Sequence, residues 1–253
     1  MKNSPRNILS YIAVTTLIVS TLAGAGAQTV DSPIGSLSFE RGLPTEDTVT
    51  KLFDALDFQR ACQAYVWALP LVGIGTFQQA HYQTFGASDG DIVTYQTYRD
   101  KLGILTPNAT TPYIVSFVNL SRTGPVVVDL PAGPNASGVG DFWQHSVTDM
   151  GQTGPDKGAG GKYLIVGPGQ TEPPDAEDYL VVHSTTINIW PALRALDPDP
   201  TKAQQWIDKV AIYPYSQREH PPAKAKIPYA CREDLASGAA PRACVLATAL
   251  GPN

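Results

Sequence analysis

Apolar and polar residues follow two different periods along this chain, and the change falls near residue 90. After Thr45, apolar side chains recur at intervals of three and four residues, at Val49, Leu52, Phe53 and Leu56. This spacing is typical of a helix with one apolar face, and Thr45 followed by two acidic residues suits a helix start. We expect Pro70 to end or kink this helix, and a second helical stretch to run from residue 72 to about residue 83.

From residue 91 onward, short runs of β-branched and aromatic residues replace the helical pattern. These runs predict strands at residues 92–95, 113–120, 126–130, 142–149, 163–166 and 179–183. Residues 133–140, which are rich in glycine and small residues, predict a loop. Strands that follow each other this closely, without helices between them, favour an antiparallel arrangement.

Two helical patterns and one more strand are expected near the C-terminus. Residues 189–196 predict the start of a helix, and residues 201–210 predict a better one, with Ala203, Trp206 and Ile207 on one side. Residues 212–215 predict an edge strand, because Pro214 cannot donate a hydrogen bond to a neighbour. With 22 glycines and 22 prolines, the chain is predicted to have an α+β, mainly β fold. The expected body is an antiparallel sandwich or jelly-roll-like structure with N-terminal helices and a short C-terminal helix.

The first 27 residues have the pattern of an export signal. Lys2 and Arg6 precede an apolar run at residues 8–22, and the small residues at positions 25–27 suit a signal peptidase. We expect cleavage before Gln28 and export to the periplasm or the extracellular space. An uncleaved membrane anchor is the alternative, although the apolar run is shorter than the ~20 residues that span a bilayer. No later stretch of the sequence is apolar enough to form a stable span.

The expected domain organisation follows from these patterns. It comprises a signal peptide at residues 1–27, an extended leader at 28–44, a single β-rich domain with a helical start at 45–226, and an irregular tail at 227–253. Cys62 lies among apolar residues, which predicts a buried thiol. Cys231 and Cys244 could pair in an oxidising compartment, but three cysteines make no disulfide framework.

Net charge narrows the range of partners. Lys2 and Arg6 are the only charged residues of the signal, so cleavage changes the formal net charge from −5 to −7. An acidic chain gives no electrostatic reason to bind nucleic acid or an anionic membrane.

Two known sequence motifs match in part, and each is rejected, one on its expected structural context and one on a missing residue. Residues 86–90 fit G-x-S-x-G, but a nucleophile elbow needs a strand before the serine and a helix after it, and the expected order here is helix, turn, strand. The glycine-rich run at 154–162 lacks the Ser or Thr that a phosphate-binding loop needs at position 163. The run therefore predicts a hairpin connection, and no cofactor is predicted.

That same connection holds the first candidate site. Asp156 and Lys157 lie in a turn beside Pro155, and Asp149 lies at the end of the preceding strand. Two carboxylates and an ammonium could therefore meet at one rim of the sandwich, where they would suit general acid–base chemistry such as glycoside hydrolysis. A solvated turn with a structural ion pair is the alternative.

A second candidate cluster is expected at the start of a strand. Asn108, Thr111 and Tyr113 could face a ligand there, or satisfy the backbone of the turn. Trp143 would suit a sugar ring if exposed, and would be ordinary core if buried.

The histidines do not cluster in the sequence. His145 and Asp149 would share one face of a regular strand, but a metal needs at least one more ligand. His183 could supply it only if the two strands are neighbours, and no metal site is predicted. His81 is expected at the surface or at a helix end.

Four segments carry a resemblance to a known family: AYVWALPLV (64–72), TPNATTPY (106–113), the central block from DFWQ to GPDKGAGGKYLIVGPG (141–169), and IYPYSQREHPPAK (212–224). Together they resemble the exported bacterial family called domain of unknown function 1254. The resemblance implies a helical start and a jelly-roll-like β body, and usually a second region, domain of unknown function 1214, further along the chain. That second region is expected to be missing here through a truncated or frame-shifted C-terminus.

Three classes of function remain open on these residues. The first is an exported hydrolase acting on a saccharide or ester through Asp149, Asp156 and Lys157. The second is a noncatalytic module that binds a carbohydrate or another small polar ligand. The third is an envelope assembly part whose strand edges pair with a partner, and self-association into a homo-oligomer also stays open.

Overall fold

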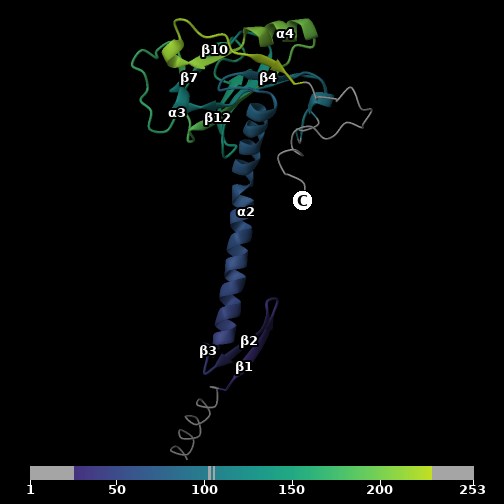
Figure 1. The fold of residues 1–253 in the computed structure, drawn as a ribbon, viewed down its shortest axis with the longest axis vertical. Helices are drawn as coiled ribbons and strands as arrows, with labels where there is room; N and C mark the ends of the chain where they lie inside the picture. The colour runs from purple at the N-terminus through teal and green to yellow at the C-terminus, as the bar shows by residue number, and fades with distance from the viewer. Residues whose placement is uncertain (1–25, 102–103, 105, 230–253) are drawn as a thin grey trace, which may run out of the picture. The chain divides into compact units, whose positions relative to one another are not determined.

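The computed structural model describes residues 26–101, 104 and 106–229 (Figure 1). The chain divides into two compact units, Met1–Ala68 and Leu69–Asn253, and the helix α2 (Glu46–Thr84) contains the point of division. The expected signal peptide lies almost entirely outside the described residues, as do most of the expected irregular tail and both Cys231 and Cys244. Of the helices in the described ranges, none combines the length and the apolar character of a membrane span.

The first unit contains a small antiparallel sheet and the beginning of α2. The expected leader forms β1 (Gln28–Ser32), β2 (Gly35–Glu40) and β3 (Leu43–Pro44). Thr48 on α2 is buried, and its hydroxyl donates to the Ser38 carbonyl at 2.9 Å and accepts from the Ser38 amide at 2.7 Å. The leader is therefore extended as expected, and it is also paired, which the sequence did not predict.

The helix α2 runs through Pro70, so of the two expected effects of this proline the helix end is wrong, and the kink stays a prediction. An interior proline costs about 3 kcal/mol through a lost hydrogen bond and a steric clash. Packing after the proline offsets this cost, because Ile74, Ala80 and His81 are buried in the second unit. His81 is only 1% exposed, so of its two expected positions the surface is wrong, whereas the helix end is confirmed, because His81 lies in the last turn of α2. Cys62, expected to be buried, is exposed on the part of α2 that belongs to the first unit.

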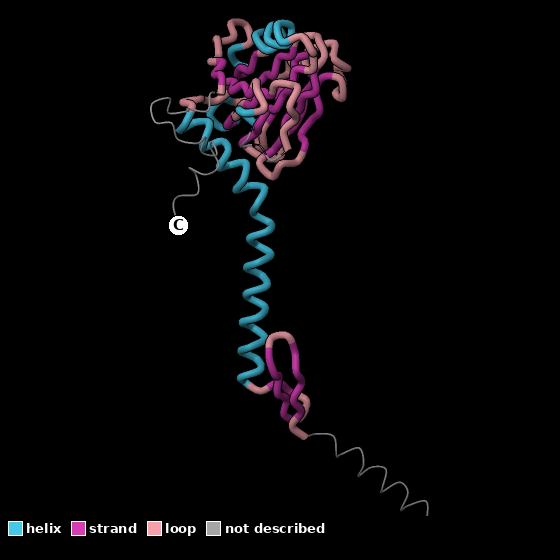
Figure 2. The backbone as a smooth tube through the Cα atoms, turned by 90° about the vertical axis from the view of Figure 1, so that its right-hand side faces the viewer, coloured by secondary structure: helices cyan, strands magenta, loops and turns pink. Residues whose placement is uncertain are grey.

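Two sheets form the β-rich second unit (Figure 2). The seven-stranded sheet has the order β14 (Lys226–Pro228), β4 (Ile92–Tyr95), β5 (Tyr113–Val115), β12 (Asn188–Ala195), β8 (Asn135–Asp141) and β9 (Ser146–Gly151), with β6 (Val118–Asn119) also paired to β12. The four-stranded sheet has the order β11 (Leu180–His183), β10 (Gly161–Val166), β7 (Val126–Leu130) and β13 (Ala211–Pro214). Most pairs are antiparallel, and β10–β11 and β4–β14 are parallel.

The main core lies between these two sheets. Ile114, Val139 and Leu193 from the seven-stranded sheet belong to one buried cluster with Val128 and Ile165 from the four-stranded sheet. The helix α4 (Pro200–Lys209) adds Ala203, Trp206 and Ile207 to the same cluster, as its predicted apolar side requires. The short helix α3 (Leu120–Thr123) and two 3-10 turns, η1 (Arg99–Lys101) and η2 (Tyr215–Gln217), lie in the connections. The predicted fold class, α+β and mainly β, is confirmed.

The expected helix at residues 189–196 is a strand, so that prediction is wrong. Along β12, burial alternates at every second residue: Ile189 and Leu193 are buried, whereas Trp190 and Arg194 are partly exposed. Pro191 is tolerated in this central strand because it faces the break between β5 and β6. Its carbonyl accepts from the Ser116 amide at 3.0 Å, and the N–H that proline lacks would point to the same side of the strand.

The expected loop at residues 133–140 is largely the strand β8, so that prediction is wrong as well. Glycine is a poor strand former in general. In β8 the small residues are required, because a Cβ on Gly140 would lie 2.2 Å from Nε1 of Trp190. The glycines here therefore mark close packing, whereas the sequence pattern indicated a turn.

Candidate functional site

An open cavity of about 380 Å³ lies on the outer face of the seven-stranded sheet, opposite the main core. Its floor consists of small residues from the two neighbouring strands β8 and β12: Ala136, Gly138, Gly140 and Ala192. The part of α2 after Leu69 covers another area of this face, where Ile74 and Phe77 pack with Val93 and Val115. The cavity thus occupies the area over β8, which has no large side chain on this face.

Trp190 forms an aromatic wall of this cavity. Its Nε1 donates to the carbonyl of Asp141 at 3.0 Å. The absence of a side chain at Gly140 lets the ring lie directly over the strand. Gln144 lines the cavity too, and its Nε2 donates to the Pro70 carbonyl at 2.8 Å, so the end of this side chain is held in place.

Asp149 supplies the carboxylate of the cavity. It lies on β9 opposite Gly138, is exposed, and makes no side-chain hydrogen bond or ion pair with any described residue. The pairing of β8 with β9 shifts register between Val139 and Gly140, which leaves one extra residue in β9. Before this shift along the chain, His145 and Ser146 also line the cavity. Asp149 therefore faces the solvent of the cavity with its hydrogen-bonding capacity unused.

Arg194 supplies the positive charge, and residues of the predicted second cluster hold it. Its Nε and Nη2 both donate to Oγ1 of Thr111 at 3.3 Å, and its guanidinium lies 5.4 Å from the centre of the Tyr113 ring. Asn108 accepts from the Thr111 hydroxyl at 2.8 Å and donates to the Tyr113 hydroxyl at 2.9 Å. Asn108, Thr111 and Tyr113 are therefore brought together, and they support Arg194 beside the cavity.

A buried lysine lies on the same aromatic ring. Lys101 is fully buried, and its Nζ donates to the carbonyls of Asn108 at 3.3 Å and of Thr111 at 2.5 Å. The ammonium lies 5.2 Å from the centre of the Tyr113 ring. Burial lowers the pKa of Lys101, and repulsion by Arg194 acts in the same direction against the attraction of Asp100. The region around Tyr113 is therefore a local concentration of positive charge.

A buried carboxylate shapes the turn before β9. Asp141 accepts from the backbone amides of Trp143 and His145, each at 2.8 Å, and from the Thr185 hydroxyl at 2.6 Å. Burial would raise the pKa of Asp141, but these hydrogen bonds outweigh it and lower the pKa. Nδ1 of His145 lies 3.4 Å from the same carboxylate. Trp143, expected as a stacking platform or as core, is half-buried in this turn and is not among the residues that line the cavity.

Asp156 and Lys157 lie in the glycine-rich connection. Oδ1 of Asp156 accepts from the Gly151 amide at 2.7 Å and from the Tyr163 hydroxyl at 2.5 Å, while Oδ2 is buried without a partner among the described residues. Burial, reinforced by the Asp156 carboxylate, raises the pKa of Tyr163 above its usual range. Asp149 lines the cavity, whereas Asp156 and Lys157 do not. That the three form one acid–base group stays a prediction.

Metal ligands do not gather in the described residues. No group of three or more His, Cys, Asp or Glu side chains in the described ranges could hold a metal ion. His183, the histidine considered as a further ligand, has its Nε2 3.2 Å from a carboxylate oxygen of Glu172.

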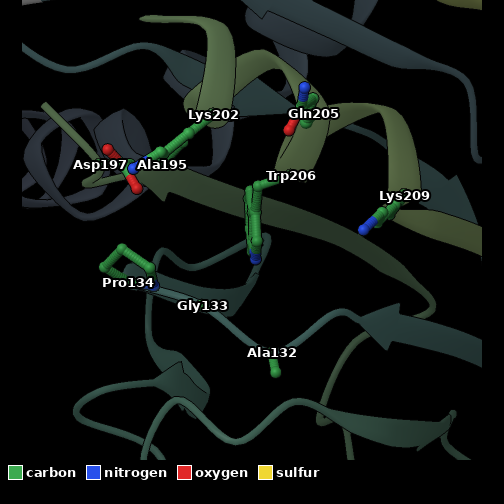
Figure 3. Close-up of a pocket in the computed structure, with 9 residues that line it drawn as sticks. All are labelled: Ala132, Gly133, Pro134, Ala195, Asp197, Lys202, Gln205, Trp206 and Lys209. Carbon is green, nitrogen blue, oxygen red and sulfur yellow. The ribbon is translucent and has the colours of Figure 1, made fainter. Parts of the chain in front are cut away.

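A second, smaller cavity of about 150 Å³ lies between α4 and residues 132–134 (Figure 3). The Trp206 ring points from α4 toward these residues, and its Nε1 donates to the Pro131 carbonyl at 3.0 Å. Lys202 and Lys209 lie around it on the exposed side of the helix. Ligand pockets usually enclose about 300–1,000 Å³, so the cavity on the seven-stranded sheet is the better candidate site.

Sequence reasoning missed Trp190 and Arg194, because their segment was expected to be helical. The alternation of Trp190, Ala192 and Arg194 with Ile189 and Leu193 was the available signal, since a period of two is typical of a strand with two different faces.

Comparison with known proteins supports the family resemblance. Residues 91–214 match the family described as "Protein of unknown function (DUF1254)", and this range includes every residue that lines the larger cavity. No curated protein matches the chain. Among solved structures, the crystal structure of the VPA0106 protein from Vibrio parahaemolyticus is similar, with a TM-score of 0.47 and 15% sequence identity. That match covers 64% of this chain and 40% of the other, so the chain corresponds to less than half of that protein.

Proposed function

We propose that the cavity on the seven-stranded sheet binds a small polar ligand of the saccharide class without transforming it. One observation carries this proposal: the aromatic wall of Trp190 and the carboxylate of Asp149, which has no ion-pair partner among the described residues, line the same open cavity. A sugar ring offers apolar C–H groups to an aromatic surface and hydroxyl donors to a carboxylate. A mostly apolar cavity with a few oriented polar groups is the usual form of a small-molecule site.

Binding without hydrolysis is favoured over the hydrolase alternative. Glycoside hydrolysis generally uses two carboxyl groups on either side of the scissile bond. Of the described residues that line the cavity, Asp149 alone carries a carboxylate. The other carboxylate considered from the sequence, Asp156, is engaged with Gly151 and Tyr163.

Export is part of the same proposal. The support is the N-terminal sequence pattern, in which Lys2 and Arg6 precede an apolar run and small residues. An exported binding module would meet saccharides of the cell envelope or of the surroundings.

Titration calorimetry with a panel of neutral and acidic mono- and disaccharides tests the proposal. Asp149→Asn should weaken binding about tenfold, since a hydrogen bond to a charged group contributes roughly 1.5–3 kcal/mol. Asp178→Asn is the matched control, because Asp178 is an exposed carboxylate that does not line the cavity. Failure of every saccharide to bind would refute the proposal, and release of hydrolysed products would replace it with the enzymatic alternative.

A further inference from the structure

The cavity carries two opposite charges that do not pair with each other. Asp149 and Arg194 both line it, and within the described part of the chain neither forms an ion pair. They lie on the two strands that flank β8, with Arg194 opposite Ala136 and Asp149 opposite Gly138. A ligand that carries complementary groups could therefore contact both.

Arg194 has hydrogen-bonding capacity left for such a ligand. A guanidinium has five N–H donors, and the contacts of Arg194 use one N–H on Nε and one on Nη2, both directed at the Thr111 hydroxyl. The other three donors have no partner among the residues that the structure describes. The stacking against Tyr113 and the contact with Thr111 hold the planar group in one orientation, which suits recognition of a carboxylate through two parallel hydrogen bonds.

The surroundings of Arg194 also favour an anionic ligand group. Lys101 and Arg194 lie close to the same Tyr113 ring, and the ammonium of Lys101 is bonded to backbone carbonyls. Lys101 and Arg194 repel each other, and neither forms an ion pair with a carboxylate of the described residues. A carboxylate bound at Arg194 would attract both cations and so offset this repulsion.

The separation of the two charges bears on the size of the ligand. The strands β9 and β12 lie on opposite sides of β8, which places their backbones about 10 Å apart, at two strand spacings. The Arg194 guanidinium is directed to Thr111 and to the Tyr113 ring of β5, on the side of β12 away from β8. A ligand that contacts both residues must therefore bridge the width of about two strands, which favours a ring-sized molecule over one as small as an α-amino acid. A sugar ring with a carboxylate at one end and hydroxyls at the other is long enough, and the ring would lie beside Trp190.

We propose that the ligand is an acidic saccharide of the uronate class, whose carboxylate pairs with Arg194 while a ring hydroxyl donates to Asp149. This inference rests on the proposed function and adds the charge of the ligand. Arg194 is then the residue that selects an acidic sugar over a neutral one.

Calorimetry with digalacturonate and with its methyl ester tests this inference on the full chain. The ester has the same ring and hydroxyls but no carboxylate, so the wild-type protein should bind it at least tenfold more weakly. Arg194→Gln should bind both compounds with similar, weak affinity. Arg194→Lys should recover part of the preference, because it restores the charge without the two-pronged geometry. Asp149→Asn should lower the affinity for both compounds by the same factor and leave the preference for the acid intact.

The outcomes separate the two proposals. Equal affinity of the wild-type protein for acid and ester, or an Arg194→Gln variant that keeps the preference, would overturn the inference and leave saccharide binding standing. Binding of neither compound, nor of any neutral sugar, would overturn both. Circular dichroism and thermal unfolding of each variant, matched to wild type, ensure that a lost preference reports on the ligand contact.

Discussion

The two faces of the seven-stranded sheet differ in what covers them, and β12 contributes to both. Toward the four-stranded sheet it presents Ile189 and Leu193, which are fully buried. Toward the other side it presents Trp190 and Arg194, which line the cavity. One strand thus serves both the stability of the body and its candidate site, because successive side chains point to opposite sides.

The inner face is mostly aliphatic, with Asn135 and Ser137 of β8 as buried polar residues, whereas the outer face is mixed. On the outer face, the end of α2 covers Val93 and Val115, but over β8, where the side chains at Ala136, Gly138 and Gly140 are small or absent, the face stays open. A substitution on the inner face should therefore change the free energy of unfolding, and one on the open area should change binding.

Leu193→Ala should have the largest effect. Leu193 is fully buried between the two sheets, and truncation of a buried leucine usually lowers the free energy of unfolding by about 2–5 kcal/mol. Urea denaturation measures this change. Ala192→Ser, on the neighbouring position of the outer face, is the matched control and should change stability by less than about 1 kcal/mol. Equal losses for the two variants would remove the distinction between the faces.

His81 should make the covered part of the outer face sensitive to acid. Its Nδ1 contacts the Phe77 carbonyl at 2.8 Å and its Nε2 contacts the Tyr95 hydroxyl at 3.0 Å. Burial lowers the pKa of His81 from 6.5 to about 4, against a smaller opposing effect of the hydrogen bond to Phe77. The unfolded chain therefore binds this proton more readily than the folded chain. The stabilisation is fully present above pH 6.5 and is lost as pH falls from 6.5 toward 4, by about 3 kcal/mol in total.

Urea denaturation at several pH values between 7 and about 4 would measure this loss for the wild-type protein and for His81→Gln. Glutamine can still accept a hydrogen bond from Tyr95 but does not titrate in this range. The variant should therefore lose less stability on acidification than the wild type. Identical pH profiles would show that His81 is not the source of the sensitivity.

Gly140→Ala should have a smaller effect on stability and a direct effect on the cavity wall. The new Cβ would lie 2.2 Å from Nε1 of Trp190, so the ring would have to move. Overpacking of this kind costs about 1–3 kcal/mol. Thermal unfolding measures the loss of stability, and titration with a saccharide measures how far the displacement of the Trp190 ring lowers the affinity. Gly75→Ala is the control, because nothing lies within 4 Å of its added Cβ; it should be neutral or stabilise the helix by up to about 1 kcal/mol.

Several elements could be predicted from the sequence because their signals are local. The strands β4 and β7 begin and end where the β-branched runs do, and α4 follows its apolar spacing and the acidic cap at Asp199. Asp149 was a candidate residue from the sequence and does line the cavity. Asn108, Thr111 and Tyr113 were expected to act together, and they do contact one another.

The rest depended on contacts between distant residues. The glycines of β8 are compatible with a strand because Trp190, far along the chain, lies over Gly140. The helix α2 continues through Pro70 because its later residues pack on the sheet. In each case a local preference was outweighed by packing that becomes available only when the chain has folded.

By itself, the sequence determined the mainly β class, the individual strands with β-branched runs and the apolar side of α4, since each of these depends on neighbouring residues in the chain. Tertiary structure alone decided the candidate site. Arg194 meets Thr111 across 83 residues of sequence, and β8 separates Arg194 from Asp149 at a spacing that follows from strand order and register. No local pattern specifies that order, because strand pairing is selected by the burial of whole sheet faces.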